Sequence, residues 1–396
     1  MRIAYFGHDS SDAAIRKRVH SFREIGVEVY SYMMTRDPYH QPDWNNVELG
    51  VTKNGAYLHR VYSIFKGAFA AGRHKRDLVA ADAIIARNFD MLATAYLTKF
   101  WLGLKTPVIY ECLDIHRLLC REDLIGTIAR GIERRLLKRS MGVLVSSPAF
   151  VEHHFSRHYP DLYRAFLIEN RLTARFADIT PRPTQVEQAL EIKNEPLKIG
   201  WVGILRCQRT LDLLDRVSRK LAGKVEIRIH GKPALRSVPE FHQTISENPN
   251  MIFAGAYCAP EDLPSIYQSF DLTWTGDFME AGLNSTWLLP NRIYEGGYFA
   301  TPFITPAGTQ TADWTSTHDS GITLNEPLEQ TLTAKLEELL DDRSEISRYR
   351  NALLDLPKDT FVEPAGFLRD ILQQIFERDT KIAFASNDAL SQPKRT

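Results

Sequence analysis

Short apolar runs alternate with helically patterned segments from the first residue of the chain onward. In AAIRKRVHSFREIG (13–26) the apolar residues recur at helical spacing, and the closing glycine suits a helix C-terminus. Strands that alternate with helices predict a parallel sheet with helices on both faces. The strands expected in the first half are RIAYFG (2–7), VEVYSYM (27–33), AIIARN (83–88), PVIYEC (107–112), GVLVSS (142–147) and FLIEN (166–170).

The pattern stops in a stretch rich in proline and polar residues, 177–197, and then begins again. We interpret this stretch as a linker between two domains, 1–176 and 198–380, with a polar, disordered tail over 381–396. The helices from Glu329 onward are expected to close the second domain, and the last is a candidate to pack back on the first. The fold class is therefore α/β, with two Rossmann-like doubly wound domains in tandem and a cleft between the carboxyl ends of their strands. The second set of strands is KIGWVGI (198–204), VEIRIHG (225–231), MIFAG (251–255), DLTW (271–274), TPFIT (301–305) and GITL (321–324).

The composition fits this reading. A chain of 396 residues with 44% apolar and 25% charged positions is ordinary for a globular protein but too long for one compact core. No basic and apolar leader precedes the first strand, and no apolar stretch reaches the roughly 18 to 20 residues of a membrane-spanning helix, so we expect a cytoplasmic protein. The four cysteines lack CxxC or zinc spacing and are expected to be buried free thiols: Cys112, Cys120, Cys207 and Cys258.

The charge is balanced over the whole chain but not along it. Residues 1–180 hold 26 Lys and Arg against 19 Asp and Glu, and residues 181–396 hold 23 against 30. Basic clusters recur in the first half at 15–20, 73–76 and 130–139. These clusters are either solvated helix faces or sites for anionic partners, namely a phosphate-bearing substrate or an acidic lipid surface.

Several familiar site motifs are absent from the sequence. GxGxxG after a strand, GxxxxGK[ST], HExxH and GxSxG do not occur, so nicotinamide, P-loop and elbow-serine chemistries have no carrier. No two aspartates stand two positions apart, which removes the usual carboxylate pair for a magnesium-bound diphosphate. We expect no metal and no cofactor, and a bound diphosphate would be neutralised by cationic side chains and helix N-termini.

The stretch LLPNRIYEGGYFATPFIT (288–305) places one glutamate, Glu295, between a helix start at Pro290 and Asn291 and a glycine pair that permits close approach. A carboxylate near a helix N-terminus can simply complement the helix dipole, by about 0.3 to 1 kcal/mol. At the carboxyl ends of parallel strands it can instead accept both hydroxyls of a ribose, with the adjoining phosphates at the helix N-terminus. The residues alone leave both interpretations of Glu295 open.

This stretch resembles the PNK-hydrophobic-hydrophobic-E and G-x-P-hydrophobic-I signature of family 4-like GT-B glycosyltransferases, retaining-type relatives in bacterial polysaccharide and lipopolysaccharide synthesis. KIGWVGILRCQRTLDLL (198–214) is similar to their donor loop, VEIRIHGKP (225–233) to their strand and glycine turn, and NMIFAGAYCAPEDLPSIYQSFDL (250–272) to the stretch that follows. The matches run in order through 198–305, whereas in the first half only the strand-helix pattern and YECLDIH (110–116) support the resemblance. Within GT-B the pattern looks most like exopolysaccharide-assembly transferases of the succinoglycan type.

The resemblance implies a nucleotide-sugar donor site in the second domain. Glu295 would hold the ribose, and Arg206 and Arg209 would clamp the diphosphate, with Arg209 at a position where the family usually has lysine. The alternative is that the two arginines only cover a helix start. The other matching donor positions are Gly203, Gly231, Asn291, Arg292 and Gly296.

The sequence departs from the family pattern at two positions. Many relatives carry a second glutamate eight residues before Glu295, where this chain has Trp287. Glu280 is the candidate to contact the hexose in its place, through a longer loop. Ile204 stands where many relatives have a second arginine. Both departures bear on the hexose contacts and on whether the anomeric configuration is retained.

Sugar transfer requires stabilisation of negative charge on the leaving diphosphate, and an inverting enzyme also needs a base near the acceptor. The candidates for this base are Asp9 and Asp12, after the first strand, and Asp114 and His116 in YECLDIH. Asp12 could equally be a helix N-cap and Asp114 a turn residue.

The sequence and its resemblance therefore predict a metal-independent hexosyltransferase that acts on a glycan acceptor in exopolysaccharide or surface polysaccharide synthesis. The expected partners are a nucleotide sugar and a lipid-linked oligosaccharide at the inner face of the cytoplasmic membrane, with peripheral contact to anionic lipid and no nucleic acid. Two alternatives remain: a nucleotide-sugar epimerase of the same fold, and a non-catalytic nucleotide-sugar-binding or scaffold relative.

Overall fold

The structure is a computed structural model that describes residues 1–36, 39, 41–51, 57–184 and 195–377. The expected tail over 381–396 and the middle of the expected linker lie outside the described residues. The chain divides into two compact units: Met1–Glu169 together with the segment from Gly366, and Asn170–Ala365. In the described part, no helix combines the length and the apolar character needed to cross a membrane.

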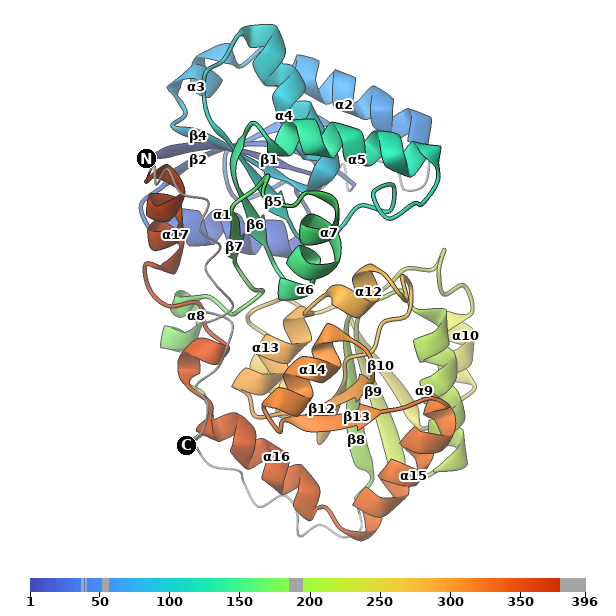
Figure 1. Ribbon diagram of the computed structural model, residues 1–396. Helices are drawn as coiled ribbons and strands as arrows, with labels where there is room; N and C mark the ends of the chain where they lie inside the picture. The colour runs from blue at the N-terminus through green and yellow to red at the C-terminus, as the bar shows by residue number, and fades with distance from the viewer. Residues whose placement is uncertain (37–38, 40, 52–56, 185–194, 378–396) are drawn as a thin grey trace. The chain divides into compact units, whose positions relative to one another are not determined.

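The first unit is built on a seven-stranded, wholly parallel sheet with the order β3-β2-β1-β4-β5-β6-β7 (Figure 1). Its strands are β1 (Arg2–Gly7), β2 (Glu28–Thr35), β3 (Asn46–Val51), β4 (Ala83–Arg87), β5 (Val108–Cys112), β6 (Ser140–Val145) and β7 (Ala165–Leu167). Its helices are α1 (Ala13–Glu24), α2 (Tyr57–Gly72), α3 (Lys75–Ala80), α4 (Asn88–Leu102), α5 (Leu124–Leu137), α6 (Pro148–Phe150), the π-helix η1 (Val151–Phe155), α7 (Ser156–His158) and α17 (Phe367–Phe376).

Helices cover both faces of this sheet, as the alternating pattern predicted. On one face, apolar side chains of α1 and α17 pack on those of the strands in a single buried cluster. The helices α2, α4 and α5 lie together on the other (Figure 1). Six of the seven strands match the sequence expectation, and β3 does not. It is a short edge strand with one buried residue in six, so it shows little of the apolar run that identifies a buried strand.

The second unit holds a six-stranded parallel sheet with the order β10-β9-β8-β11-β12-β13. Its strands are β8 (Leu197–Leu205), β9 (Val225–Pro233), β10 (Met251–Gly255), β11 (Leu272–Trp274), β12 (Phe303–Pro306) and β13 (Gly321–Leu324). Its helices are α8 (Ala174–Ile179), α9 (Gln208–Lys220), α10 (Phe241–Ser246), α11 (Leu263–Tyr267), α12 (Asn284–Trp287), α13 (Asn291–Tyr298), α14 (Gln310–Thr317), α15 (Leu328–Asp341), α16 (Ser344–Asp355) and the 3₁₀-helix η3 (Lys358–Thr360).

Two buried clusters lie on opposite faces of this sheet. Alternate residues of β8 point to opposite faces: Ile199 and Trp201 join the cluster with α9 and α15, whereas Val202 joins the cluster with α11 and α13. All six strands match the sequence expectation. Because every strand is parallel, the loops that follow the strands gather at one edge of the sheet, and ligands of such folds bind at this edge.

Candidate functional site

At the carboxyl edge of the second sheet, a glycine pair leaves the backbone bare. Gly203 on β8 pairs in register with Gly231 on β9, and both have positive φ angles, +121° and +144°. A Cβ atom on Gly231 would lie 1.8 Å from the carbonyl oxygen of Gly203, so no side chain fits there. Such a position allows close approach of a ligand to the main chain.

The helix α13 brings the predicted glutamate to this region. Pro290 is its N-cap residue, Asn291 begins the helix, and Glu295 follows in the second turn with only 8% of its surface exposed. The hydroxyl of Tyr267 donates a hydrogen bond of 2.8 Å to Oε2 of Glu295. Burial and the charge of Glu295 both raise the pKa of Tyr267 well above its usual value. Tyr267 therefore stays a neutral donor that orients the carboxylate.

The remaining α13 candidates divide by role. The guanidinium of Arg292 donates a hydrogen bond of 3.3 Å to the carbonyl of Val202, so the start of α13 lies beside the end of β8. Gly296 and its neighbour Gly297 lie inside the helix, where close approach is indeed required. A Cβ on Gly296 would come within 3.1 Å of Phe303. Packing therefore explains Gly296 without a ligand.

The two predicted diphosphate-binding arginines already hold carboxylates. Arg206, directly after β8, donates from Nε and Nη2 to Oδ2 of Asp277 at 3.1 and 3.0 Å. Burial raises the pKa of Asp277, but the charges of Arg206 and Arg292 and the hydrogen bonds from Met279 and Arg206 together outweigh it, so the pKa lies below its usual value. Arg209 on α9 pairs with Glu326, and its guanidinium lies 4.4 Å from the ring centre of Phe278. An incoming diphosphate would compete with these carboxylates for the same guanidinium groups.

The loop after β11 therefore contacts both arginines, through Asp277 and through Phe278. The same loop carries Glu280, whose Oε2 accepts a hydrogen bond of 2.7 Å from Asn284 on the short helix α12. Trp287 ends α12, and Ile204 is 64% exposed beside Arg206. Sequence reasoning missed the role of Asp277, because its partner lies 71 positions away along the chain.

In the first unit, the loop between β1 and α1 engages both candidate aspartates in local structure. Oδ1 of Asp9 accepts from the backbone N–H of Ser11 and Arg36 at 3.1 and 3.2 Å. Asp12 caps α1 by accepting from the backbone N–H of Ala14 and Ile15 at 2.8 and 3.1 Å. The contacts of Asp12 assign it the N-cap role that the sequence had left as an alternative. Those of Asp9 give it a structural role that the sequence analysis did not consider.

Asp12 also has a partner that the sequence analysis missed. Nε2 of His8 lies 3.6 Å from the Asp12 carboxylate, and its Nδ1 is buried without a hydrogen-bond partner among the described residues. Burial raises the pKa of Asp12, but the hydrogen bond and charge of His8 and the charge of Arg87 outweigh it and hold the pKa far below its usual value. A carboxylate with so low a pKa is a weak base at neutral pH. The available signal was the HxxxD spacing directly after a strand.

The second pair of base candidates follows β5. Asp114 is exposed. Nδ1 of His116 accepts a hydrogen bond of 3.2 Å from the backbone N–H of Leu118, which leaves the ring proton on Nε2, 3.7 Å from Asp90. In this tautomer Nδ1 already accepts a hydrogen bond and Nε2 carries a proton, so neither ring nitrogen can take a proton from the acceptor sugar. Leu118 and Asp90 thus hold His116 as a hydrogen-bond donor.

A buried ionic network beneath these loops was also not predicted. Oε1 and Oε2 of Glu111, on β5, accept from Arg18 at 2.9 Å and from Arg87 at 2.9 and 3.1 Å, and the hydroxyl of Tyr5 donates to Oε2 at 2.5 Å. All four side chains are almost fully buried. Within the described residues no group of three or more His, Cys, Asp or Glu side chains could hold a metal ion.

Comparisons with known proteins identify the family. A scan against known protein families finds no match. The chain is 36% identical over 327 residues to the succinoglycan biosynthesis protein ExoL of Rhizobium meliloti (strain 1021), which covers 82% of this chain and 81% of ExoL. Anabaena Alr3699/HepE, solved in complex with UDP, has a TM-score of 0.66 at 13% identity over 95% of this chain and 99% of its own. A glycosyltransferase from Rickettsia africae ESF-5 has a TM-score of 0.66 at 12% identity over 96% and 99%.

These findings confirm the expected α/β fold with two parallel sheets, and they confirm the resemblance to succinoglycan-type transferases. The chain therefore has the fold of these solved structures and belongs to the family of the succinoglycan biosynthesis protein ExoL.

Proposed function

We propose that this chain transfers a hexose from a nucleotide diphosphate sugar to a glycan acceptor in bacterial exopolysaccharide synthesis, without a metal ion. One observation supports this most: the bare backbone of Gly203 and Gly231, the guanidinium groups of Arg206 and Arg292, and the buried Glu295 gather around the carboxyl edge of one parallel sheet. Each feature meets one requirement of a nucleotide-sugar donor.

The two ends of the nucleotide diphosphate would bind to different groups. Glu295, oriented by Tyr267, accepts the ribose hydroxyls, and Arg206 and Arg209 exchange Asp277 and Glu326 for the diphosphate oxygens. As the acceptor oxygen bonds to the anomeric carbon, the bond from that carbon to the diphosphate breaks. The arginines then stabilise the charge that develops on the leaving phosphate. UDP is the first nucleotide to test, since HepE was solved with UDP.

The acceptor is assigned to the first unit, where a base is needed if the reaction inverts the anomeric carbon. Asp12 is a weak base in its capping position, and His116 is held as a donor. We propose Asp114, which is exposed in the loop after β5, as this base. The excess of basic residues in the first half suits an acceptor that is linked to a lipid diphosphate.

The test is a thermal-shift titration with UDP, GDP, ADP, dTDP and CMP in the presence of a chelator. One nucleotide should raise the melting temperature of the wild type, because a ligand that binds only the folded state stabilises it. Glu295→Gln and Arg206→Ala should each weaken binding of that nucleotide by roughly 10- to 100-fold, as expected for loss of a charged hydrogen bond.

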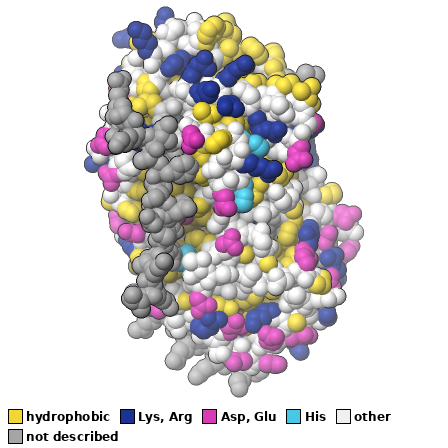
Figure 2. Space-filling view, viewed as in Figure 1, with side chains coloured by type: hydrophobic (Ala, Val, Ile, Leu, Met, Phe, Trp, Pro, Cys, Tyr) yellow, Lys and Arg dark blue, Asp and Glu magenta, His cyan; other side chains and the backbone are white. Residues whose placement is uncertain are grey.

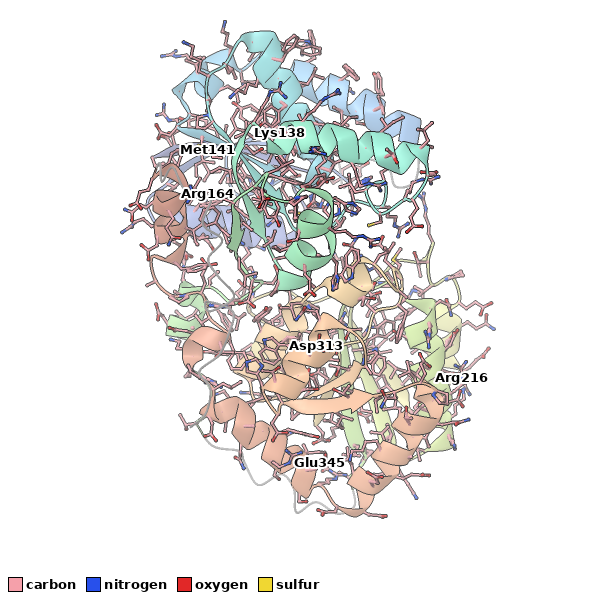
Figure 3. All side chains as sticks on the ribbon, in the orientation of Figure 1. Lys138, Met141, Arg164, Arg216, Asp313 and Glu345 are labelled. Atoms are coloured by element: carbon pink, nitrogen blue, oxygen red, sulfur yellow. The ribbon has the colours of Figure 1, made fainter. Side chains whose placement is uncertain are left out.

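The matched control is Arg216→Ala, because Arg216 lies on α9 as Arg209 does and pairs with Glu329 (Figure 3). This variant should bind the nucleotide as the wild type does. Equal binding by Glu295→Gln and the wild type would contradict the assigned donor site. Nucleotide binding without sugar transfer over a broad acceptor panel would favour the non-catalytic alternative.

A further inference from the structure

The helix α5 of the first unit presents an apolar stripe that the described residues leave exposed. Its buried face consists of Gly126, Ala129, Glu133 and Leu137, at helical spacing. On another face, four aliphatic side chains are 42 to 74% exposed: Leu124, Ile125, Ile128 and Ile132. Large aliphatic side chains that recur at i, i+4 and i+8 on a solvent-facing side of a helix form a continuous stripe.

Basic residues border this stripe at its C-terminal end. Arg134, Arg135 and Lys138 are all exposed. None of the three forms an ion pair with any residue in the described ranges, whereas Arg121 and Arg130, toward the other end of α5, hold a carboxylate and backbone carbonyls. We name the four aliphatic residues and these three cations the α5 surface.

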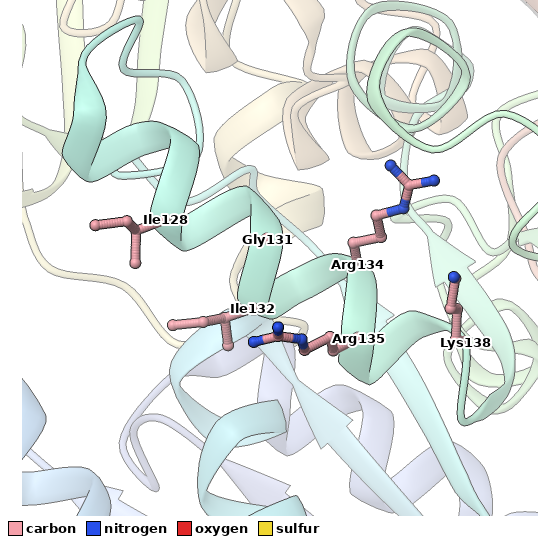
Figure 4. Close-up of a pocket in the computed structure, with 6 residues that line it drawn as sticks. All are labelled: Ile128, Gly131, Ile132, Arg134, Arg135 and Lys138. Carbon is pink, nitrogen blue, oxygen red and sulfur yellow. The ribbon is translucent and has the colours of Figure 1, made fainter.

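A hollow of about 450 Å³ lies on this surface, lined by Ile128, Gly131, Ile132 and the three cations (Figure 4). Gly131 borders open space there, since a Cβ atom at this position would meet no other atom within 4 Å. In Figure 4 Ile128, Ile132 and Arg135 project to one side of the helix, and Arg134 projects away from them. An anionic group at Arg135 would thus adjoin an apolar chain along the isoleucines.

Exposed apolar residues also occur on the neighbouring helices of the same layer. On α2 these are Val61, Tyr62, Phe65 and Phe69, and on α4 they are Phe100 and Trp101, each 47 to 81% exposed. The helix α4 packs against both α2 and α5. Figure 2 shows Lys and Arg side chains intermingled with hydrophobic ones on the first unit. The α5 surface therefore lies in a layer of helices that expose further apolar side chains.

We propose that the α5 surface docks on an anionic phospholipid bilayer, with the aliphatic stripe inserted among the acyl chains and the three cations on lipid phosphates. Amphipathic helices that lie in a membrane interface combine these two features. Docking would bring the first unit to the membrane in which the proposed lipid-linked acceptor lies, but the docking itself needs no substrate.

The test is flotation with vesicles of phosphatidylcholine that contain 30% phosphatidylglycerol, and with vesicles of phosphatidylcholine alone, in the absence of nucleotide sugar. The wild type should float with the anionic vesicles, and raised salt should weaken its binding. Ile128→Ser with Ile132→Ser, and Arg134→Gln with Arg135→Gln and Lys138→Gln, should each reduce the partition coefficient by on the order of tenfold or more.

Matched controls lie on the second unit. Ile252→Ser removes an isoleucine that is 45% exposed on β10, and Arg216→Gln with Arg219→Gln and Lys220→Gln removes three cations from α9. Both should float as the wild type does. The nucleotide-induced thermal shift should be unchanged in every variant, which separates docking from the donor site.

Three outcomes would overturn the proposal: a wild type that stays with the soluble fraction, α5 variants that float as well as the controls, or a wild-type dimer that the isoleucine variants dissociate. A wild type whose melting temperature no nucleotide raises would instead contradict the proposed donor site and leave the docking proposal unaffected.

Discussion

At the residue scale, the buried carboxylate of Glu111 shows how the first sheet tolerates charge. Burial alone would raise the pKa of Glu111, but the charges of Arg87 and Arg18 outweigh it and lower the pKa to about 2. The pKa is thus lower in the folded chain than the ordinary value of 4.5. Glu111 therefore stabilises the fold fully above about pH 4.5, and this contribution is lost as the pH falls toward 2.

We predict that Glu111→Gln lowers the free energy of unfolding at pH 7 by roughly 3 to 5 kcal/mol, because it leaves Arg18 and Arg87 buried without their carboxylate. The variant should also lose the part of the wild-type pH dependence that lies between about pH 4.5 and 2. Urea unfolding as a function of pH measures both effects. Glu28→Gln is the control, since Glu28 is half exposed beside Arg2; an equal loss there would contradict the argument.

At the element scale, α13 depends on a glycine that the helix would otherwise not favour. A Cβ on Gly297 would lie 2.2 Å from Cε1 of Phe361, whose ring is fully buried and also stacks under Arg182 at 4.9 Å. Glycine in a helix costs about 0.5 to 1 kcal/mol relative to alanine. Here the Phe361 ring lies so close to the helix that only glycine fits at position 297.

We predict that Gly297→Ala destabilises the second unit by roughly 1 to 3 kcal/mol, because Phe361 has no room to move. Gly131→Ala is the matched change, since it also replaces a helical glycine but places Cβ in open space. It should stabilise the first unit by about 0.5 to 1 kcal/mol. Denaturant midpoints measure both, and a stabilised Gly297→Ala would show that the contact at Phe361 relaxes.

The elements were predictable to the extent that they are buried. In the described part of the chain, twelve of the thirteen strands follow from apolar runs, and the exception, β3, is a half-exposed edge strand. The helix start at Pro290 and Asn291 was likewise visible, because proline marks it locally. The side-chain contacts of the site could not be predicted in this way. Asp277 and Glu326 hold arginines 71 and 117 positions away, and sequence periodicity carries no information about such pairs.

At the scale of the whole molecule, the chain returns to the first unit at its end. Leu368, Ile371, Leu372 and Ile375 of α17 are buried in the same cluster as β1 and α1. Two arginines tie the helix down: Arg164, labelled in Figure 3, donates to the carbonyl of Gln374 at 3.0 Å, and Arg369 donates to the carbonyl of Ile25 at 3.1 Å.

We predict that Leu372→Ala costs roughly 2 to 5 kcal/mol and that this cost falls on the first unit alone. Hydrogen exchange resolved by peptide should then show faster exchange in β1 and β6 and unchanged exchange in β8 and β9. Leu353→Ala, which removes a fully buried leucine of the second unit, should give the reverse pattern. Equal effects of Leu372→Ala on both sheets would mean that the two units unfold together.

The return of α17 also fixes an order of events during synthesis. The apolar surface formed by Ile3, Val19 and Phe22 is complete once the first 169 residues have left the ribosome, but its cover is not. The whole second unit must be translated before α17 emerges, which takes roughly 10 to 40 s at elongation rates of about 5 to 20 residues per second. During that interval the nascent first unit exposes an apolar surface to the solvent, and chaperones can bind this surface until α17 covers it.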